Sequence, residues 1–223
     1  MSKSKSEIKP FYVYTNKDKL YIKSINEKTE KLSSNINSYC ANIDSSNKIH
    51  ICAIDLYGRL IHFSNNKDSW KKNIIGKAFN NIKVIKEMRL FILDNYLNIL
   101  TLEESPLDED LYRVTHFNFS TSNYKVNKFN INNIVKDDEQ IYKVSIDSLS
   151  NIILEYKPFQ SNTRNHTENI KLVFNAKSRT WLTSNTLLRC QNNYSKYNTT
   201  IEDDIFDYCY GINYKLKTNK RLH

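Results

Sequence analysis

Short runs of alternating apolar and polar residues fill most of the chain. Two of them, KIHICAID (48–55) and RLIHF (59–63), flank the short segment LYG (56–58), which contains the turn residue Gly58. Alternation with a period of two places successive side chains on opposite faces of a strand, and Val, Ile, Tyr and Phe are favoured in strands. Apolar stripes with the 3.6-residue period of a helix are absent. The pattern therefore predicts an all-β chain of short strands.

One hairpin pattern occurs three times. An aliphatic residue and Asp are followed by polar turn residues and then by an Ile- or Leu-rich strand. The three copies are IDSSNKIHI (43–51), LDNYLNILT (93–101) and IDSLSNIIL (146–154), which place Asp44, Asp94 and Asp147 at separations of 50 and 53 residues. An Asp that opens a tight turn accepts bonds from backbone N–H groups two residues on, so we expect these carboxylates to close hairpins and not to bind cations.

A second landmark keeps nearly the same period. A Phe ends an alternating strand at positions 63, 117 and 174, and a large aromatic residue follows seven positions later, at Trp70, Tyr124 and Trp181. These aromatic rings could stack on a sugar. Since they recur with the repeat, we expect them to occupy equivalent positions and to pack between neighbouring sheets. Two landmarks with a period of about 50–57 residues indicate a repeat array.

Each repeat contains four predicted strands, which is the content of one β-propeller blade. We predict a small propeller of about four antiparallel blades within one domain, residues 10–212, between a disordered N-terminus (1–9) and a basic tail (213–223). The first blade lacks its first strand, so we expect a tail strand to complete it and close the ring. The blades are expected at about 10–36, 37–76, 87–131 and 140–188, and the closing strand at about 204–212.

The segments IDSSNKIHI, LYRVTHFNF and NIKLVFNAKSRTW together resemble repeat β-propeller proteins of AT-rich, low-GC bacteria. That resemblance covers about residues 10–190 and implies the propeller fold, but no settled activity. FSNNKDSW and NAKSRTW also show a distant likeness to the Asp-box hairpins of sialidases. The Gly of that motif is missing, so sialidase chemistry is not carried over.

Composition adds a net charge of +9 and a pI near 9.2. Such a charge can attract nucleic acid or another polyanion. However, Asn, Ile and Lys make up roughly a third of the chain, far above ordinary usage, and the Lys residues are spread out. Binding of nucleic acid or another polyanion is therefore a third option, behind a protein partner and a glycan. The chain has no apolar run long enough to span a bilayer and no secretory signal, so we expect a cytoplasmic protein.

The four cysteines are too few and too scattered for a disulfide framework, and no Cys or His pair has zinc spacing. We expect reduced thiols, no metal and no cofactor. The first predicted hairpin sets a register in which Cys40 faces Cys52. No Walker loop, GxSxG or HExxH motif occurs, and His62 and His116 share a repeat position before Phe63 and Phe117. We therefore predict a protein that is not an enzyme.

The loops between the second and third strands grow along the chain. All such loops lie on one face of a propeller, and insertions on one face of a repeat array often mark its working surface. The two longest loops are ESPLDEDLY (104–112) and KPFQSNTRNHTEN (157–169). The candidate binding residues are Asp108, Glu109, Asp110, Phe159, Arg164 and His166.

These loops favour a non-catalytic scaffold that binds a protein partner. A lectin-like propeller that binds a glycan is the alternative, and polyanion binding is the third. Buried Trp70 and Trp181 would favour a protein partner, whereas exposed aromatic rims near the long loops would favour a glycan. The oligomeric state and the partner's identity are open at this point.

Overall fold

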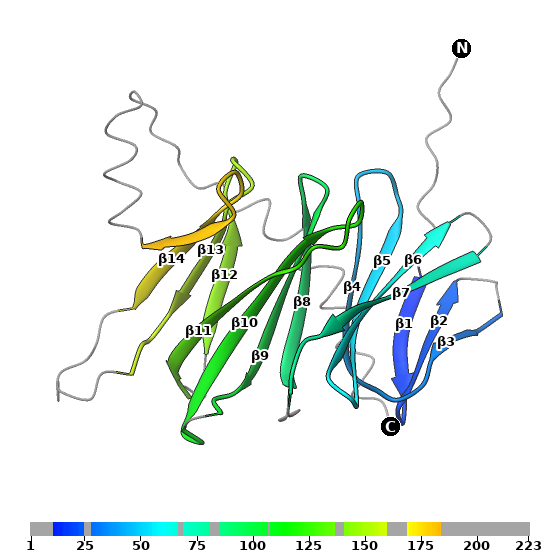
Figure 1. The fold of residues 1–223 in the computed structure, drawn as a ribbon, viewed down its shortest axis with the longest axis horizontal. Helices are drawn as coiled ribbons and strands as arrows, with labels where there is room; N and C mark the ends of the chain where they lie inside the picture. The colour runs from blue at the N-terminus through cyan, green and yellow to red at the C-terminus, as the bar shows by residue number, and fades with distance from the viewer. Residues whose placement is uncertain are drawn as a thin grey trace, which may run out of the picture. The chain divides into compact units, whose positions relative to one another are not determined.

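The computed structural model describes residues 11–24, 28–66, 69–80, 85–106, 108–136, 141–159 and 169–183. These residues form fifteen strands in four antiparallel sheets, and they contain no helix (Figure 1). The prediction of an all-β chain built from repeated antiparallel sheets is therefore confirmed. The expected closing strand at 204–212 and the tail lie outside the described residues, as do Arg164 and His166.

The first sheet has three strands and the second has four. Their orders are β1-β2-β3 and β4-β5-β6-β7, with every neighbouring pair antiparallel. The strands are β1 (Phe11–Asn16), β2 (Lys19–Ser24), β3 (Glu30–Ser33), β4 (Ile36–Ile43), β5 (Ile49–Asp55), β6 (Arg59–Asn66) and β7 (Ser69–Lys77). Both sheets belong to one compact unit, unit 1, which also includes residues 88–90.

The other two sheets have four strands each, in sequence order along the sheet. Their strands are β8 (Ile85–Leu93), β9 (Tyr96–Glu104), β10 (Leu111–Ser120), β11 (Asn127–Val135), β12 (Tyr142–Ile146), β13 (Ile152–Tyr156), β14 (Ile170–Asn175) and β15 (Thr180–Thr183). Apart from residues 88–90, these strands form a second compact unit, unit 2.

Each unit has an apolar core to which both of its sheets contribute. In unit 1, Val13 and Leu20 from the first sheet pack with Ile51 and Phe63 from the second. In unit 2, residues such as Leu100 and Val114 pack with Val144, Leu154 and Phe174. Burial of alternate residues on facing sheets provides the main stabilising free energy, so the period-two pattern of the sequence positions these strands.

The predicted register of the first hairpin is confirmed. Cys40 is the direct partner of Cys52 in the β4–β5 ladder, and both are buried, reduced thiols. The turn Asp residues behave as expected in two of three repeats. Asp44 Oδ1 accepts the backbone N–H groups of Ser46 and Lys48, and Asp147 Oδ1 accepts those of Leu149 and Asn151.

Asp94 departs from this pattern. It occupies the first position of a two-residue turn between β8 and β9, where Asp94 and Asn95 both have positive φ values, of 47° and 65°. That backbone conformation suits Asp and Asn and joins two strands without help from a side chain. Among the described residues, no hydrogen bond reaches the Asp94 carboxylate.

The expectation that the three aromatic residues hold equivalent positions is wrong. Trp181 pairs with Phe174 in the β14–β15 ladder, whereas Trp70 pairs with Asn65 in the β6–β7 ladder. Tyr124 precedes β11, in a turn with a φ of 54°. Each aromatic residue follows its Phe by seven positions, but the turns between them differ in length. The aromatic residues therefore stand opposite different residues of the preceding strand. Trp70 and Trp181 nevertheless pack, half-buried, against the cores of their own units, as expected for these two rings.

Candidate functional site

The three acidic candidates lie together in the turn between β9 and β10. Asp108, Glu109 and Asp110 are all exposed. Asp108 Oδ1 accepts the backbone N–H of Asp110 at 2.9 Å, and the Ser105 N–H donates to the Leu111 carbonyl at 2.9 Å. This closed turn presents three carboxylates to solvent from a fixed backbone.

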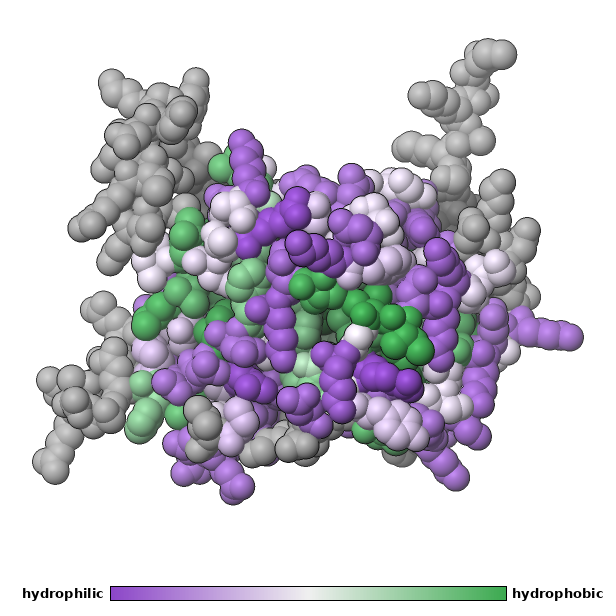
Figure 2. All heavy atoms as spheres, in the orientation of Figure 1, coloured by the Kyte–Doolittle hydropathy of each residue, from purple (hydrophilic) through white to green (hydrophobic). Residues whose placement is uncertain are grey.

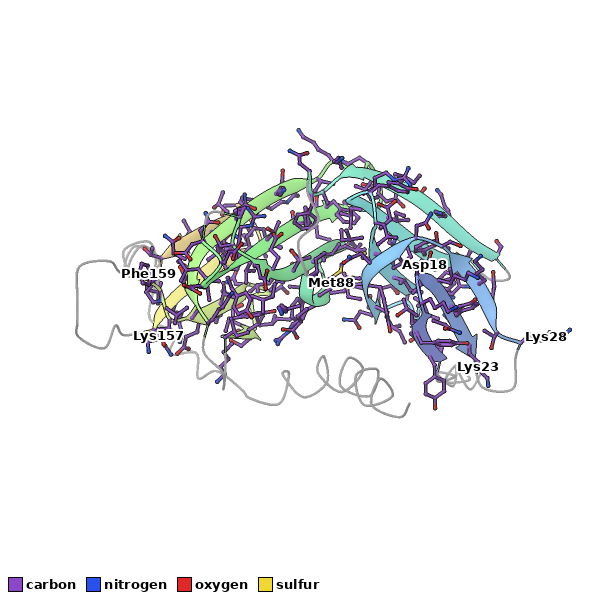
Figure 3. All side chains as sticks on the ribbon, turned by 90° about the horizontal axis from the view of Figure 1, so that it is seen from below. Asp18, Lys23, Lys28, Met88, Lys157 and Phe159 are labelled. Carbon is purple, nitrogen blue, oxygen red and sulfur yellow. The ribbon has the colours of Figure 1, made fainter. Side chains whose placement is uncertain are left out.

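Phe159 lies on a segment that covers the outer edge of β11. The Val135 N–H donates to the Lys157 carbonyl at 3.0 Å, and the Phe159 N–H donates to the Asn133 carbonyl at 2.8 Å. Pro158 forms an isolated bridge with Ile134 between these two bonds. Figure 3 labels Lys157 and Phe159, which lie next to the strands of the β12–β15 sheet. Half of the Phe159 surface stays exposed, at 50%.

The same end of β11 also holds the acidic turn. The Lys136 Nζ donates to the Glu109 carbonyl oxygen and lies 5.0 Å from the centre of the Tyr112 ring. The structure therefore brings together four of the six candidates: Asp108, Glu109, Asp110 and Phe159. We call this surface, residues 108–110, 133–136 and 157–159, the loop platform.

Sequence reasoning missed a buried chain of three side chains in unit 1. His50 lies 3.2 Å from Asp44 through its Nε2 and 2.9 Å from His62 Nε2 through its Nδ1. The Nε2–H of neutral His50 donates a hydrogen bond to the Asp44 carboxylate. The other ring nitrogen, Nδ1, therefore has no proton and accepts a hydrogen bond from His62 Nε2–H. Burial lowers the pKa of His50, although Asp44 opposes the shift, and burial with nearby positive charge lowers the pKa of His62 to about 3.

A second buried chain runs through unit 2. The Trp181 Nε1–H donates to His116 Nδ1 at 3.2 Å, and His116 Nε2 lies 3.1 Å from Asn98 Oδ1. Asn118 Nδ2 donates to the same Asn98 oxygen at 2.8 Å. Burial lowers the pKa of His116 to about 3, so the ring is neutral. The repeat position before Phe63 and Phe117 could have indicated that His62 and His116 are internal, but not their partners.

No group of three or more His, Cys, Asp or Glu side chains that could hold a metal ion is found in the part of the chain that the structure describes. The thiols add no reactive group, because burial raises the pKa of both Cys40 and Cys52. Nor does any helix within the described ranges have the length and apolar character to cross a membrane.

Basic charge is concentrated in unit 1. Its described residues include eleven Lys and Arg against four Asp and Glu, whereas those of unit 2 include ten against nine. Lys23 in β2 and Lys28, which precedes β3, are exposed (Figure 3), and hydrophilic residues cover much of the face shown in Figure 2. Lys71 and Lys72 are neighbours on β7 and point to opposite faces. These lysines do not gather on one face.

No family model matches the chain, and no curated protein matches it. A solved fucose lectin from Kordia zhangzhouensis, in complex with methyl-fucoside, is 9% identical with a TM-score of 0.34, covering 66% of this chain and 97% of the lectin. The fission yeast SREBP–SCAP binding domains are 9% identical with a TM-score of 0.39. That match covers 92% of this chain and 58% of the yeast chain. At such TM-scores neither likeness supports a conclusion, and the propeller resemblance stays a prediction.

Proposed function

We propose that this protein is a non-catalytic scaffold that binds a protein partner through the loop platform. The observation that carries the proposal is the anchoring of two separate loops on one strand end. The acidic turn bonds Lys136, and the Phe159 segment pairs with residues 133–135. A half-exposed aromatic ring on a backbone that is hydrogen-bonded to a strand suits an interface anchor, because little further ordering is needed on binding.

The partner's chemistry follows from these groups. Phe159 requires an apolar pocket, and Asp108, Glu109 and Asp110 favour Lys or Arg around that pocket. Complementary charge of this kind raises the association rate and selects the partner, whereas the aromatic ring provides most of the affinity. A basic surface with a hydrophobic recess is therefore the expected counterpart.

The test compares three forms of the full chain as bait in an extract of the source cells. The forms are the wild type, Phe159→Ala and Leu149→Ala. Leu149 is a matched control, because it is 67% exposed in a turn of the same sheet. We expect at least one protein to be captured by the wild type and the control but lost with Phe159→Ala, with an affinity loss of about 30-fold once purified. Identical captured sets for all three forms would overturn the proposal.

The scaffold is proposed to be a four-bladed propeller completed by the tail strand at 204–212. Support comes from sheet composition: three sheets have four strands, and the sheet β1-β2-β3 has three, with β1 at its edge. An added strand would cover the outward backbone groups of β1. This proposal is tested by amide hydrogen exchange on the full chain and on a form ending at residue 203. We expect β1 amides to lose protection in the shorter form; unchanged protection would contradict the closing strand.

A further inference from the structure

A small pocket lies in unit 2, at the opposite end of β9 from the acidic turn. It has room for about one water-sized group and opens to the surface. The turns β8–β9, β12–β13 and β14–β15 surround it. Its polar and aromatic lining comes from Asp94, Tyr96, Asn98, Asn118, Ser150 and Phe174.

One lining atom has no hydrogen-bond partner in the described structure. Asn118 is 2% exposed, and its Oδ1 is buried without a donor. An unsatisfied buried acceptor is costly, so this atom favours any group that brings a hydrogen-bond donor into the pocket.

The orientation of the Asn118 amide is fixed by the neighbouring chain of hydrogen bonds. Because Trp181 donates to His116 Nδ1, the neutral His116 ring carries its proton on Nε2 and donates to Asn98 Oδ1. The Asn98 amino group donates instead to the Tyr96 carbonyl at 3.3 Å. Asn118 must then present Nδ2 to Asn98. Turning the Asn118 amide over would oppose two oxygens, so its Oδ1 remains the open acceptor.

A second acceptor stands at the rim. In the repeats before and after this one in the sequence, the corresponding Asp is occupied: Asp44 bonds His50, and Asp147 Oδ2 accepts from Asn151 Nδ2 at 2.9 Å. Asn98 holds the position that His50 and Asn151 hold in the other two repeats. Its side chain bonds His116, Asn118 and the Tyr96 carbonyl instead of Asp94, so the exposed Asp94 carboxylate is available to a ligand. One repeat of the three thus combines a free carboxylate with a donor-seeking amide oxygen.

The charges at the rim select the class of ligand. The Arg179 guanidinium lies 3.9 Å from the centre of the Tyr96 ring, so positive charge already stands beside the pocket and disfavours an ammonium ligand. Anions would face the Asp94 carboxylate and the Asn118 acceptor. Two acceptors at different depths are best matched by neighbouring hydroxyl groups. We propose that this pocket takes one hydroxyl of a neutral saccharide, which donates to Asn118 Oδ1 while an adjacent hydroxyl donates to Asp94.

This pocket is separate from the loop platform. Glycan binding, the alternative function, is thereby assigned to the residues around Asn118 and Asp94. The experiment follows backbone amide signals of the labelled full chain by NMR during titration with methyl glycosides of the common aldohexoses, with glycerol, and with ammonium chloride. Variants are Asn118→Leu, which removes the acceptor, and Asp94→Asn, which keeps a residue suited to positive φ. Glu155→Gln, a carboxylate on β13 outside the pocket, is the control.

We expect saturable shifts at Tyr96 and Ala176 with at least one glycoside. Binding should weaken about tenfold in Asn118→Leu and several-fold in Asp94→Asn, and should be unchanged in Glu155→Gln. Since Asp94→Asn alters only an exposed turn, it tests the proposal even if Asn118→Leu fails to fold. The proposal is overturned if no glycoside gives saturable shifts and a crystal shows only an ordered water at Asn118. It is overturned equally if ammonium gives the response, or if both variants bind like the wild type.

Discussion

The indole N–H of Trp181 donates to Nδ1 of His116 across 3.2 Å, and this contact sets the proton positions of a whole polar chain. It forces the His116 proton onto Nε2, which fixes Asn98 and in turn Asn118. Trp181 belongs to the outermost strand of its sheet and does not line the pocket at Asn118. Its effect on that pocket is therefore purely one of positioning.

Replacing Trp181 with Phe should weaken saccharide binding without touching the ligand. The variant removes the N–H donor, so His116 can carry its proton on Nδ1 and accept at Nε2. Asn98 can then turn over, at the cost of its long bond to the Tyr96 carbonyl, and Asn118 can turn with it, so that Asn118 Oδ1 accepts from the Asn98 amino group. We expect glycoside affinity to fall at least several-fold, and the His116 ring nitrogens to show the changed tautomer by NMR. An unchanged tautomer with weaker binding would mean that the loss came from packing.

Mild acidification should destabilise the protein through its buried histidines. The pKa of His62 and of His116 is about 3 in the folded state, against an ordinary value of 6.5. The unfolded chain therefore binds more protons below about pH 6.5, and stability present above that pH is lost as the pH falls. Each His should cost about 2 kcal/mol at about pH 5.

This pH effect is measured by urea unfolding at about pH 7.5 and about pH 5. His62→Gln should reduce the difference in unfolding free energy between the two pH values, because one of the buried rings with a lowered pKa is removed. A wild-type midpoint that does not move between these pH values would show that the buried rings are protonated without penalty.

The buried carboxylate of Glu103 should depend strongly on its arginine. Glu103 Oε1 accepts from Arg113 Nε at 3.0 Å, from Arg113 Nη2 at 2.9 Å and from Thr115 Oγ1 at 2.7 Å. Removing the guanidinium leaves the buried carboxylate with one hydrogen-bond donor, the neutral Thr115 hydroxyl, besides the charge of Lys128, so Arg113→Ala should cost about 3 kcal/mol of unfolding free energy.

Lys86→Ala is the matched control for that measurement. Glu104 follows Glu103 in β9, and its Oε1 lies 3.8 Å from Lys86 Nζ. Unlike the Glu103–Arg113 pair, both side chains of this pair are substantially exposed. Its loss should cost less than about 1 kcal/mol. If Arg113→Ala and Lys86→Ala lower the unfolding free energy by similar amounts in a denaturant titration, the buried Glu103–Arg113 pair does not stabilise the fold more than an exposed pair.

The thiols of Cys40 and Cys52 should resist alkylation while the protein is folded. Both are buried, and burial raises the pKa of each, so the reactive thiolate is scarce. Mass spectrometry after iodoacetamide treatment should find both unmodified in buffer and both modified in concentrated urea. Rapid modification of Cys52 in buffer would indicate that the β4–β5 hairpin opens readily.

The strands and their registers could be predicted because they depend on a period-two pattern that is visible locally. The facing of Cys40 and Cys52 follows from the turn at Asp44 alone. The aromatic positions could not be predicted in the same way, since a change in turn length before Trp70 or Tyr124 moves the ring along the ladder without changing its spacing from Phe.

The two buried chains depend on contacts between residues far apart in sequence. Trp181 and His116 are 65 residues apart, and nothing near either one indicates the other. The free state of Asp94 was hidden for a related reason. Its repeat motif matches those of Asp44 and Asp147, but its turn has only two residues, and its carboxylate accepts no hydrogen bond from the described residues.

The pairing of residues 157–159 with β11 has a consequence for how copies of this chain behave in a crowded solution. β11 ends its sheet, and an uncovered strand edge is a template on which another molecule can add a strand. Pro158 opposes Ile134 at that edge and has no N–H to offer to a newcomer. Residues 157–159 therefore also prevent another copy of the chain from adding a strand to β11. Shortening this segment should increase aggregation.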